Sequence, residues 1–309
     1  MRNEDTDDAE NYEEQVSEAH KEPQKDFQQE YSRIQPQVHT YQAHTHQSTS
    51  PPPISPTPPA VWSMITLLLE QSGGLYFICG GSLIHADWVL TAAHCVTDGG
   101  PYWVLLGRYN LNEPESSEQL IPVEKFYVHE EYNNANAAKG YDIALLKLSY
   151  SAKLTPEVKP ACLPPAGYTP PHGTKCYITG WGTTSTGGSV SDVLREGLLP
   201  VVDYEHCSQW DWWGSTVNKC HICAGGYEVS GCNGDSGGPL NCLTEDGCWK
   251  VCGVASFVSG YGCNTYKKPT VFTCVGCFIG WIEKCPPDTF VLLQWQDFIV
   301  GTDSPENLK

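Results

Sequence analysis

Short apolar runs separated by turn signals fill the sequence from residue 61 onward, and this pattern restricts the fold more than any other feature. The runs are rich in β-branched and aromatic residues and lie at 65–69, 88–91, 103–106, 143–148, 176–179, 198–202, 250–257 and 270–272. Many short strands of this kind are typical of a β-barrel or a β-sandwich. Apolar residues at helical spacing over 275–284 predict one C-terminal helix. We therefore expect an all-β fold that ends in a short helix.

The folded part is expected to span residues 61–285 and to contain two halves. A proline-rich link without clear periodicity covers residues 161–171. It separates a first half of about 61–160 from a second half of about 172–274. The chain is long enough for each half to bury its own core.

The two ends of the chain differ from this part in composition. Residues 1–60 are rich in Glu, Gln, Ser, Thr and Pro and poor in aliphatic residues, which predicts a disordered acidic and proline-rich tail. His39, His44 and His46 in this tail could bind a metal, but a solvated polar stretch is the favoured interpretation. Residues 286–309 are expected to be a C-terminal extension.

Charge and cysteine content limit the functional classes. The formal net charge is −18, and an acidic chain without a basic patch is a poor nucleic-acid binder. Residues 61–69 are too short an apolar run to cross a membrane. Residues 1–5 lead into acidic positions, so no secretory signal peptide is visible. Fifteen cysteines nevertheless suggest an oxidising compartment.

One glycine-rich segment carries a candidate nucleophile. Residues 231–240 read Gly-Cys-Asn-Gly-Asp-Ser-Gly-Gly-Pro-Leu, with Ser236 at the centre. Glycine permits the positive φ angles of a sharp turn. Such a turn can direct the backbone N–H groups of Gly234 and Ser236 at one point beside the hydroxyl. Two converging donors next to a nucleophile form an oxyanion hole.

Two upstream motifs supply the groups that a serine nucleophile needs. His94 lies in Thr91-Ala92-Ala93-His94-Cys95, and Asp142 opens the apolar run Ile143-Ala144-Leu145-Leu146. A serine hydroxyl reacts well only when a base removes its proton and a third group fixes that base. The order His, Asp, Ser therefore predicts a catalytic triad of His94, Asp142 and Ser236.

These motifs resemble those of the trypsin-like serine proteases, in particular the pancreatic, chymotrypsin-like elastases. The resemblance runs from about Trp62 to Lys284. It also rests on the segments Cys79-Gly80-Gly81-Ser82-Leu83-Ile84, Leu106-Gly107-Arg108-Tyr109-Asn110-Leu111, Cys176-Tyr177-Ile178-Thr179-Gly180-Trp181-Gly182 and Leu199-Pro200-Val201-Val202-Asp203-Tyr204-Glu205-His206-Cys207. It implies two six-stranded antiparallel β-barrels with the active site between them. His94 and Asp142 would belong to the first barrel and Ser236 to the second.

The resemblance also implies a specificity pocket for substrates. Ser256 matches the serine that supports the triad aspartate. Ser230 matches the base of the pocket, where a neutral residue does not select Lys or Arg. Val258 and Thr270 match wall positions, and their branched side chains would leave room for small aliphatic groups only.

Cysteine positions in the same family imply four disulfides: Cys79–Cys95, Cys176–Cys242, Cys207–Cys223 and Cys232–Cys263. Seven cysteines then lack an assigned partner, and an odd total requires at least one free thiol or an intermolecular bond. They are Cys162, Cys220, Cys248, Cys252, Cys274, Cys277 and Cys285. Zinc coordination by these residues is the weaker interpretation.

No metal or other cofactor is expected. Some relatives bind calcium, and Glu115 and Glu118 match acidic ligand positions there. Arg108 stands where the first carboxylate ligand would be, and a cation there disfavours calcium. We therefore expect Arg108 to pair with a glutamate.

Activation is where the sequence departs from the family. Relatives are cut to expose an Ile or Val amine, which pairs with the aspartate before the serine, here Asp235. The matching position near Ser50 reads Ser50-Pro51-Pro52-Pro53, with no basic residue before it.

Two functions therefore stay open, a secreted elastase-like endopeptidase and a catalytically silent protease-like binding protein or decayed copy. The expected partners are protein or peptide substrates and protein protease inhibitors, with no nucleic acid and no membrane. The expected state is a monomer.

Overall fold

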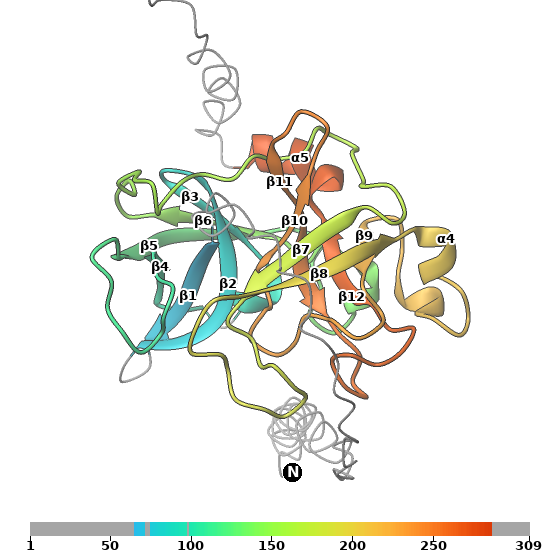
Figure 1. The fold of residues 1–309 in the computed structure, drawn as a ribbon. Helices are drawn as coiled ribbons and strands as arrows, with labels where there is room; N and C mark the ends of the chain where they lie inside the picture. The colour runs from blue at the N-terminus through green and yellow to red at the C-terminus, as the bar shows by residue number, and fades with distance from the viewer. Residues whose placement is uncertain (1–64, 72–74, 98, 286–309) are drawn as a thin grey trace, which may run out of the picture. The chain divides into compact units, whose positions relative to one another are not determined.

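The strands close into two six-stranded antiparallel barrels, as expected (Figure 1). A computed structural model describes residues 65–71, 75–97 and 99–285 of the 309-residue chain. The predicted tail at 1–60 and the predicted extension at 286–309 lie outside these residues.

The first barrel has the strand order β1-β2-β3-β6-β5-β4, and the second has β7-β8-β9-β12-β11-β10. The two barrels therefore share one topology. The first contains β1 (Ile65–Gln71), β2 (Leu75–His85), β3 (Trp88–Thr91), β4 (Tyr102–Leu106), β5 (Gln119–Val128) and β6 (Ala144–Leu148). The second contains β7 (Lys175–Gly180), β8 (Arg195–Val202), β9 (His221–Ala224), β10 (Pro239–Leu243), β11 (Trp249–Phe257) and β12 (Thr270–Cys274).

Helices are few and short. The predicted C-terminal helix is confirmed as α5 (Val275–Lys284). The second α-helix of the described residues, α4 (Tyr204–Cys207), begins after Asp203, whose side chain accepts the N–H of His206 and so caps the first turn. Single 3-10 turns occur at η1 (Ala93–Cys95), η2 (Ala137–Lys139) and η3 (Gly214–Thr216). No helix among the described residues is long and apolar enough to cross a membrane.

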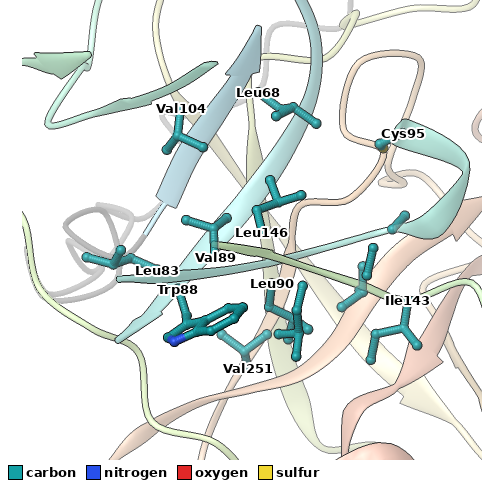
Figure 2. Close-up of a cluster of buried hydrophobic side chains, with 14 of the residues drawn as sticks. Leu68, Leu83, Trp88, Val89, Leu90, Cys95, Val104, Ile143, Leu146 and Val251 are labelled. Atoms are coloured by element: carbon teal, nitrogen blue, oxygen red, sulfur yellow. The ribbon is translucent and has the colours of Figure 1, made fainter. Parts of the chain in front are cut away.

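The core of the first barrel is formed by buried apolar residues of its strands and extends beyond the barrel (Figure 2). Leu90 of β3 and Leu146 of β6 are fully buried. Val251 of β11 and Phe278 of α5 pack into the same cluster. The second half of the chain therefore contributes directly to the core that supports the first.

The core of the second barrel has a disulfide within it. Cys176 and Cys242 are fully buried and joined, and they lie in a cluster with Leu199, Leu240 and Phe272. Leu240 is the second residue of β10, the strand that follows the glycine-rich turn, so this cluster fixes one end of the segment that carries Ser236.

Candidate active site

His94 and Asp142 are brought together by the pairing of β3 with β6. Thr91 at the end of β3 pairs with Ala144 at the start of β6, so the residues just beyond these ends face each other. Nδ1 of His94 lies 2.8 Å from Oδ2 of Asp142, and the backbone N–H of His94 donates to Oδ1 at 2.9 Å. A carboxylate that accepts from Nδ1 leaves the Nε2 lone pair free to take a proton.

Residues of the second barrel also contact Asp142 and help to stabilise its ionised form. Its side chain is only 4 % exposed. Ser256 of β11 donates to Oδ2 at 2.5 Å, and Thr273 of β12 donates to the Asp142 carbonyl at 2.8 Å. Burial acts to raise the pKa of Asp142, but the hydrogen bonds from His94 and Ser256 outweigh it and hold the pKa below its ordinary value. The Thr273 contact was not expected, because a strand threonine carries no sequence signal for it.

The turn that carries Ser236 is seated against the first barrel. The N–H of Gly80 in β2 donates to the Ser236 carbonyl at 2.7 Å. Gly237 has φ of +75°, and a Cβ there would lie 2.3 Å from Oγ1 of Thr91. Thr91 ends the strand that leads to His94, so this close approach places Ser236 beside the His94 turn. Among the described residues, the Ser236 hydroxyl makes no hydrogen bond to His94.

The backbone donors of this turn are free to bind a ligand. Gly234 adopts φ of +98°, a conformation that glycine permits at low cost. Within the described part of the chain, neither the N–H of Gly234 nor that of Ser236 is used in a hydrogen bond. Both expected oxyanion-hole donors are therefore unengaged.

Asp235 is a partly buried residue whose carboxylate is enclosed by glycines. It accepts the N–H of Gly182 and that of Cys232, each at 2.9 Å. A Cβ at Gly180 or Gly182 would lie within 2.5 Å of this carboxylate. Burial raises the pKa of Asp235 to about 6, against the effect of the two hydrogen bonds. No cationic side chain among the described residues forms an ion pair with it.

Ser230 and Thr270, two of the expected pocket residues, both form hydrogen bonds with the backbone of Gly231. The hydroxyl of Thr270 accepts the Gly231 N–H at 2.8 Å, and Ser230 donates its hydroxyl to the Gly231 carbonyl at 3.0 Å. Phe257 of β11 pairs with Val271 of β12, so Val258 follows at the level of Thr270. A cavity of about 300 Å³ lies next to this region and is lined by Ser230 and Asp235 among others, but Val258 and Thr270 are not among its lining residues.

The structure joins the four expected cysteine pairs and adds a fifth. The expected bridges are Cys79–Cys95, Cys176–Cys242, Cys207–Cys223 and Cys232–Cys263. Cys162 and Cys248, left unassigned by the sequence, form the fifth bridge. The free cysteines of the described residues are Cys220, Cys252, Cys274, Cys277 and Cys285.

Arg108 occupies the region compared with a calcium loop. Its guanidinium lies 2.8 Å from Oε2 of Glu118, as expected. Glu115 accepts the backbone N–H groups of Tyr109 and Asn110. All three side chains are therefore used within the loop itself.

The fold has two barrels of the same topology, and a glycine-rich serine turn of the second barrel packs against the first. This is the architecture of the chymotrypsin-fold serine endopeptidases. The Trypsin family matches residues 54–282 of the chain. The human chymotrypsin-like elastase family members 3A and 3B are 58% and 57% identical over 222 residues, which cover 71% of this chain and 82% of each relative. Bovine proproteinase E is 56% identical over 229 residues, covering 73% of this chain and 90% of the relative. The chain belongs to the trypsin family and, within it, to the chymotrypsin-like elastases.

Proposed function

We propose that the chain hydrolyses peptide bonds after small aliphatic residues through a triad of His94, Asp142 and Ser236. The observation that carries this proposal is the chain of hydrogen bonds from Ser256 through Asp142 to His94. Those three residues come from both barrels, and the serine turn is seated beside them. A structural role alone does not call for a buried carboxylate that is bonded to an accessible imidazole.

In the proposed reaction, Oγ of Ser236 attacks the carbonyl carbon of the substrate while Nε2 of His94 takes the hydroxyl proton. The N–H groups of Gly234 and Ser236 stabilise the negative oxygen of the tetrahedral intermediate. His94 then donates its proton to the leaving amine, and an acyl-enzyme remains. Water repeats the sequence with His94 as base, and Asp142 stabilises the imidazolium form at both stages.

The proposed preference for small side chains rests on three residues. Ser230 would place a hydroxyl, and no charge, at the base of the pocket. Thr270 is 2 % exposed and its methyl group would contact any side chain at Gly231. Val258 and Thr270 together would exclude aromatic groups. The discrimination is expected to be modest, because apolar pockets separate substrates by about 1–3 kcal/mol per methylene.

Activation is proposed to depend on Asp235. A buried carboxylate without a cation is costly, and a chain amine inserted beside it would supply the missing charge. The segment near Ser50 that would provide this amine lies outside the described residues. The name of bovine proproteinase E describes a precursor form, which supports a zymogen for this chain as well.

The silent binding protein remains the second candidate, and the observation that favours it is that Asp235 has no ion-pair partner among the described residues. Secretion is proposed from the membership in this family, together with the five disulfides. Protein or peptide substrates, protein protease inhibitors and a monomeric state remain proposals.

Hydrolysis of an alanyl peptide separates the two candidates. Two proteins are compared at equal folded concentration: the full chain, and a version with a cleavable leader in place of residues 1–49 and Val-Val-Gly-Gly in place of Ser50-Pro51-Pro52-Pro53. We expect turnover only from the second protein after cleavage, and its loss by about 10⁴-fold or more in Ser236→Ala. No turnover from either protein would favour the binding protein, and activity retained in Ser236→Ala would refute the triad.

A further inference from the structure

Three side chains with metal-ligating groups converge on the second barrel, and the proposed catalytic reaction uses none of them. His172 precedes β7, Asp203 follows β8 and His206 lies in α4. One ligand atom from each residue lies within 4.8 Å of the others. Two imidazoles and a carboxylate are a ligand set suited to zinc and copper.

The distances within this cluster are close to those of a metal centre. Nδ1 of His206 lies 2.5 Å from Oδ1 of Asp203, and Nδ1 of His172 lies 3.5 Å from Oδ2. Tetrahedral zinc with bonds of about 2.0–2.1 Å separates its ligand atoms by about 3.3 Å. The 3.5 Å distance from His172 to Oδ2 is close to that value. The 2.5 Å contact is a hydrogen bond of His206 to the other oxygen, Oδ1, so the His206 ring would turn away from Oδ1 to bind an ion beside Oδ2. The two imidazoles stack with centroids 4.9 Å apart and planes inclined by 24°.

The capping of α4 accounts for only one oxygen of the carboxylate. Oδ1 of Asp203 accepts the backbone N–H of His206 at 2.9 Å, which is the cap. Oδ2 faces His172 and takes no part in it. The Asp203 N–H donates to Nδ1 of His172 at 3.2 Å, so the lone pair of that nitrogen is directed at the Asp203 backbone, and an ion bound at Nδ1 would replace this hydrogen bond.

Rigid backbone holds the three residues in place. The segment 173–174 exchanges two hydrogen bonds with Val201, of 2.8 and 2.9 Å, which fixes the turn after His172 to the end of β8. His206 is followed by Cys207, which is bonded to Cys223 of β9. A site whose ligands are already positioned loses little conformational entropy when the ion binds.

We propose that His172, Asp203 and His206 bind a divalent transition-metal ion, Zn²⁺ or Cu²⁺, through two imidazole nitrogens and Oδ2 of the carboxylate. The side chains of His172 and His206 are 53% and 52% exposed. A fourth coordination position therefore faces solvent, where water or a donor from another molecule completes the shell. The bound ion would link the turn before β7 to α4.

The test measures zinc binding to the full chain by titration calorimetry. Other candidate ligands are removed first, by His39→Gln, His44→Gln, His46→Gln and Cys277→Ser. In this parent protein we expect one equivalent of Zn²⁺ to bind, and excess Ca²⁺ or Mg²⁺ not to compete, because those ions prefer oxygen ligands. Absence of zinc binding to the parent would overturn the proposal.

Variants then assign the ligands. Asp203→Asn keeps an equally good helix cap and removes the charge, so the fold is retained while zinc binding weakens. We expect Asp203→Asn, His172→Gln and His206→Gln each to weaken binding by about tenfold or more. The matched control is His85→Gln, because His85 also faces a carboxylate, Asp87 at 3.5 Å, but belongs to no cluster of three ligand groups. Equal affinity in Asp203→Asn and the control would overturn the proposal.

The spectrum of bound Cu²⁺ reports the ligand atoms directly and does not depend on the thermal stability of the variant. We expect the electron paramagnetic resonance spectrum of the Cu²⁺-loaded parent to show coupling to two imidazole nitrogens. His206→Gln should show one. An unchanged nitrogen coupling in that variant would place the ion elsewhere and contradict the assignment.

Discussion

The two barrels share one strand order but supply different things to the site. The first supplies the proposed base, since His94 and Asp142 are positioned by paired strands above a tightly packed apolar core. The second supplies a turn with positive φ angles, and it positions that turn through disulfides and backbone hydrogen bonds. Equal topology therefore does not imply equal roles. The contacts between the barrels at Asp142 and at Gly237 bring the two parts of the candidate site together.

The largest expected effect comes from breaking the contact at Gly237. Gly237→Ala places a Cβ 2.3 Å from Thr91, at φ of +75°. The matched control is Gly187→Ala, where φ is +71° and nothing lies within 4 Å of a Cβ. Both variants carry the backbone cost of about 1–2 kcal/mol for a positive φ. We expect kcat/KM of the activated protein to fall by about 100-fold or more in Gly237→Ala only. Similar losses in both variants would show that the contact with Thr91 has no special role.

Two disulfides allow the barrels to be compared directly. Cys79–Cys95 and Cys207–Cys223 both have a sequence separation of 16 residues. Replacing either pair by alanine should lower the free energy of unfolding by about 3 kcal/mol, because the closed loops are equal in length. Only the first pair adjoins His94, so only its removal should lower kcat. Denaturant unfolding and steady-state kinetics measure the two quantities, and equal kcat values would contradict the account.

The pH dependence of stability tests Asp235 in the chain before activation. Its pKa of about 6 exceeds the ordinary value of 3.8, so the folded state binds the proton more tightly than the unfolded state. The free energy of unfolding should therefore fall as the pH rises from about 4 to about 6. The loss relative to Asp235→Asn is expected to be about 3 kcal/mol. Parallel stability curves for the two proteins would mean that the carboxylate is solvated or paired.

The smallest expected effect concerns the pocket of the second barrel. Val258→Gly combined with Thr270→Gly should raise kcat/KM for Phe relative to Ala at the P1 position. A gain of about 1–3 kcal/mol in relative transition-state stabilisation is expected, as for other apolar pockets. The measurement uses matched peptides with Ala, Phe and Arg at that position. Higher activity on Arg than on Ala peptides in the unmodified pocket would refute the assignment of Ser230.

The fold class could be predicted because most strands contain a short apolar run. No such run was predicted for β2, β5, β9 or β10. Gly80 and Gly81 interrupt β2, and Glu124 and Lys125 interrupt β5. In β2 the reason is physical: a Cβ at Gly80 would lie 3.0 Å from Gly238. Close approach of the serine turn thus takes precedence over strand propensity.

The sequence was enough to predict the residues of the candidate site, but not all of the contacts and disulfides that hold them in place. Thr273 and the Cys162–Cys248 bridge join positions far apart in the sequence, and neither has a local signal. His206 lies in a motif used for the resemblance, whereas His172 reaches the same cluster only through the pairing of β7 with β8. Long-range pairing of this kind is a property of the fold and is not encoded in any short motif.

The central claim is that residues of both barrels together activate Ser236. Labelling by diisopropyl fluorophosphate, mapped by peptide mass spectrometry, tests it most directly because the reagent needs an activated serine. The account predicts that the activated protein is labelled at Ser236 alone among its serines, and that labelling is lost in His94→Ala and strongly slowed in Gly237→Ala but not in Gly187→Ala. Labelling of Ser236 at an unchanged rate in His94→Ala and Gly237→Ala would contradict the claim.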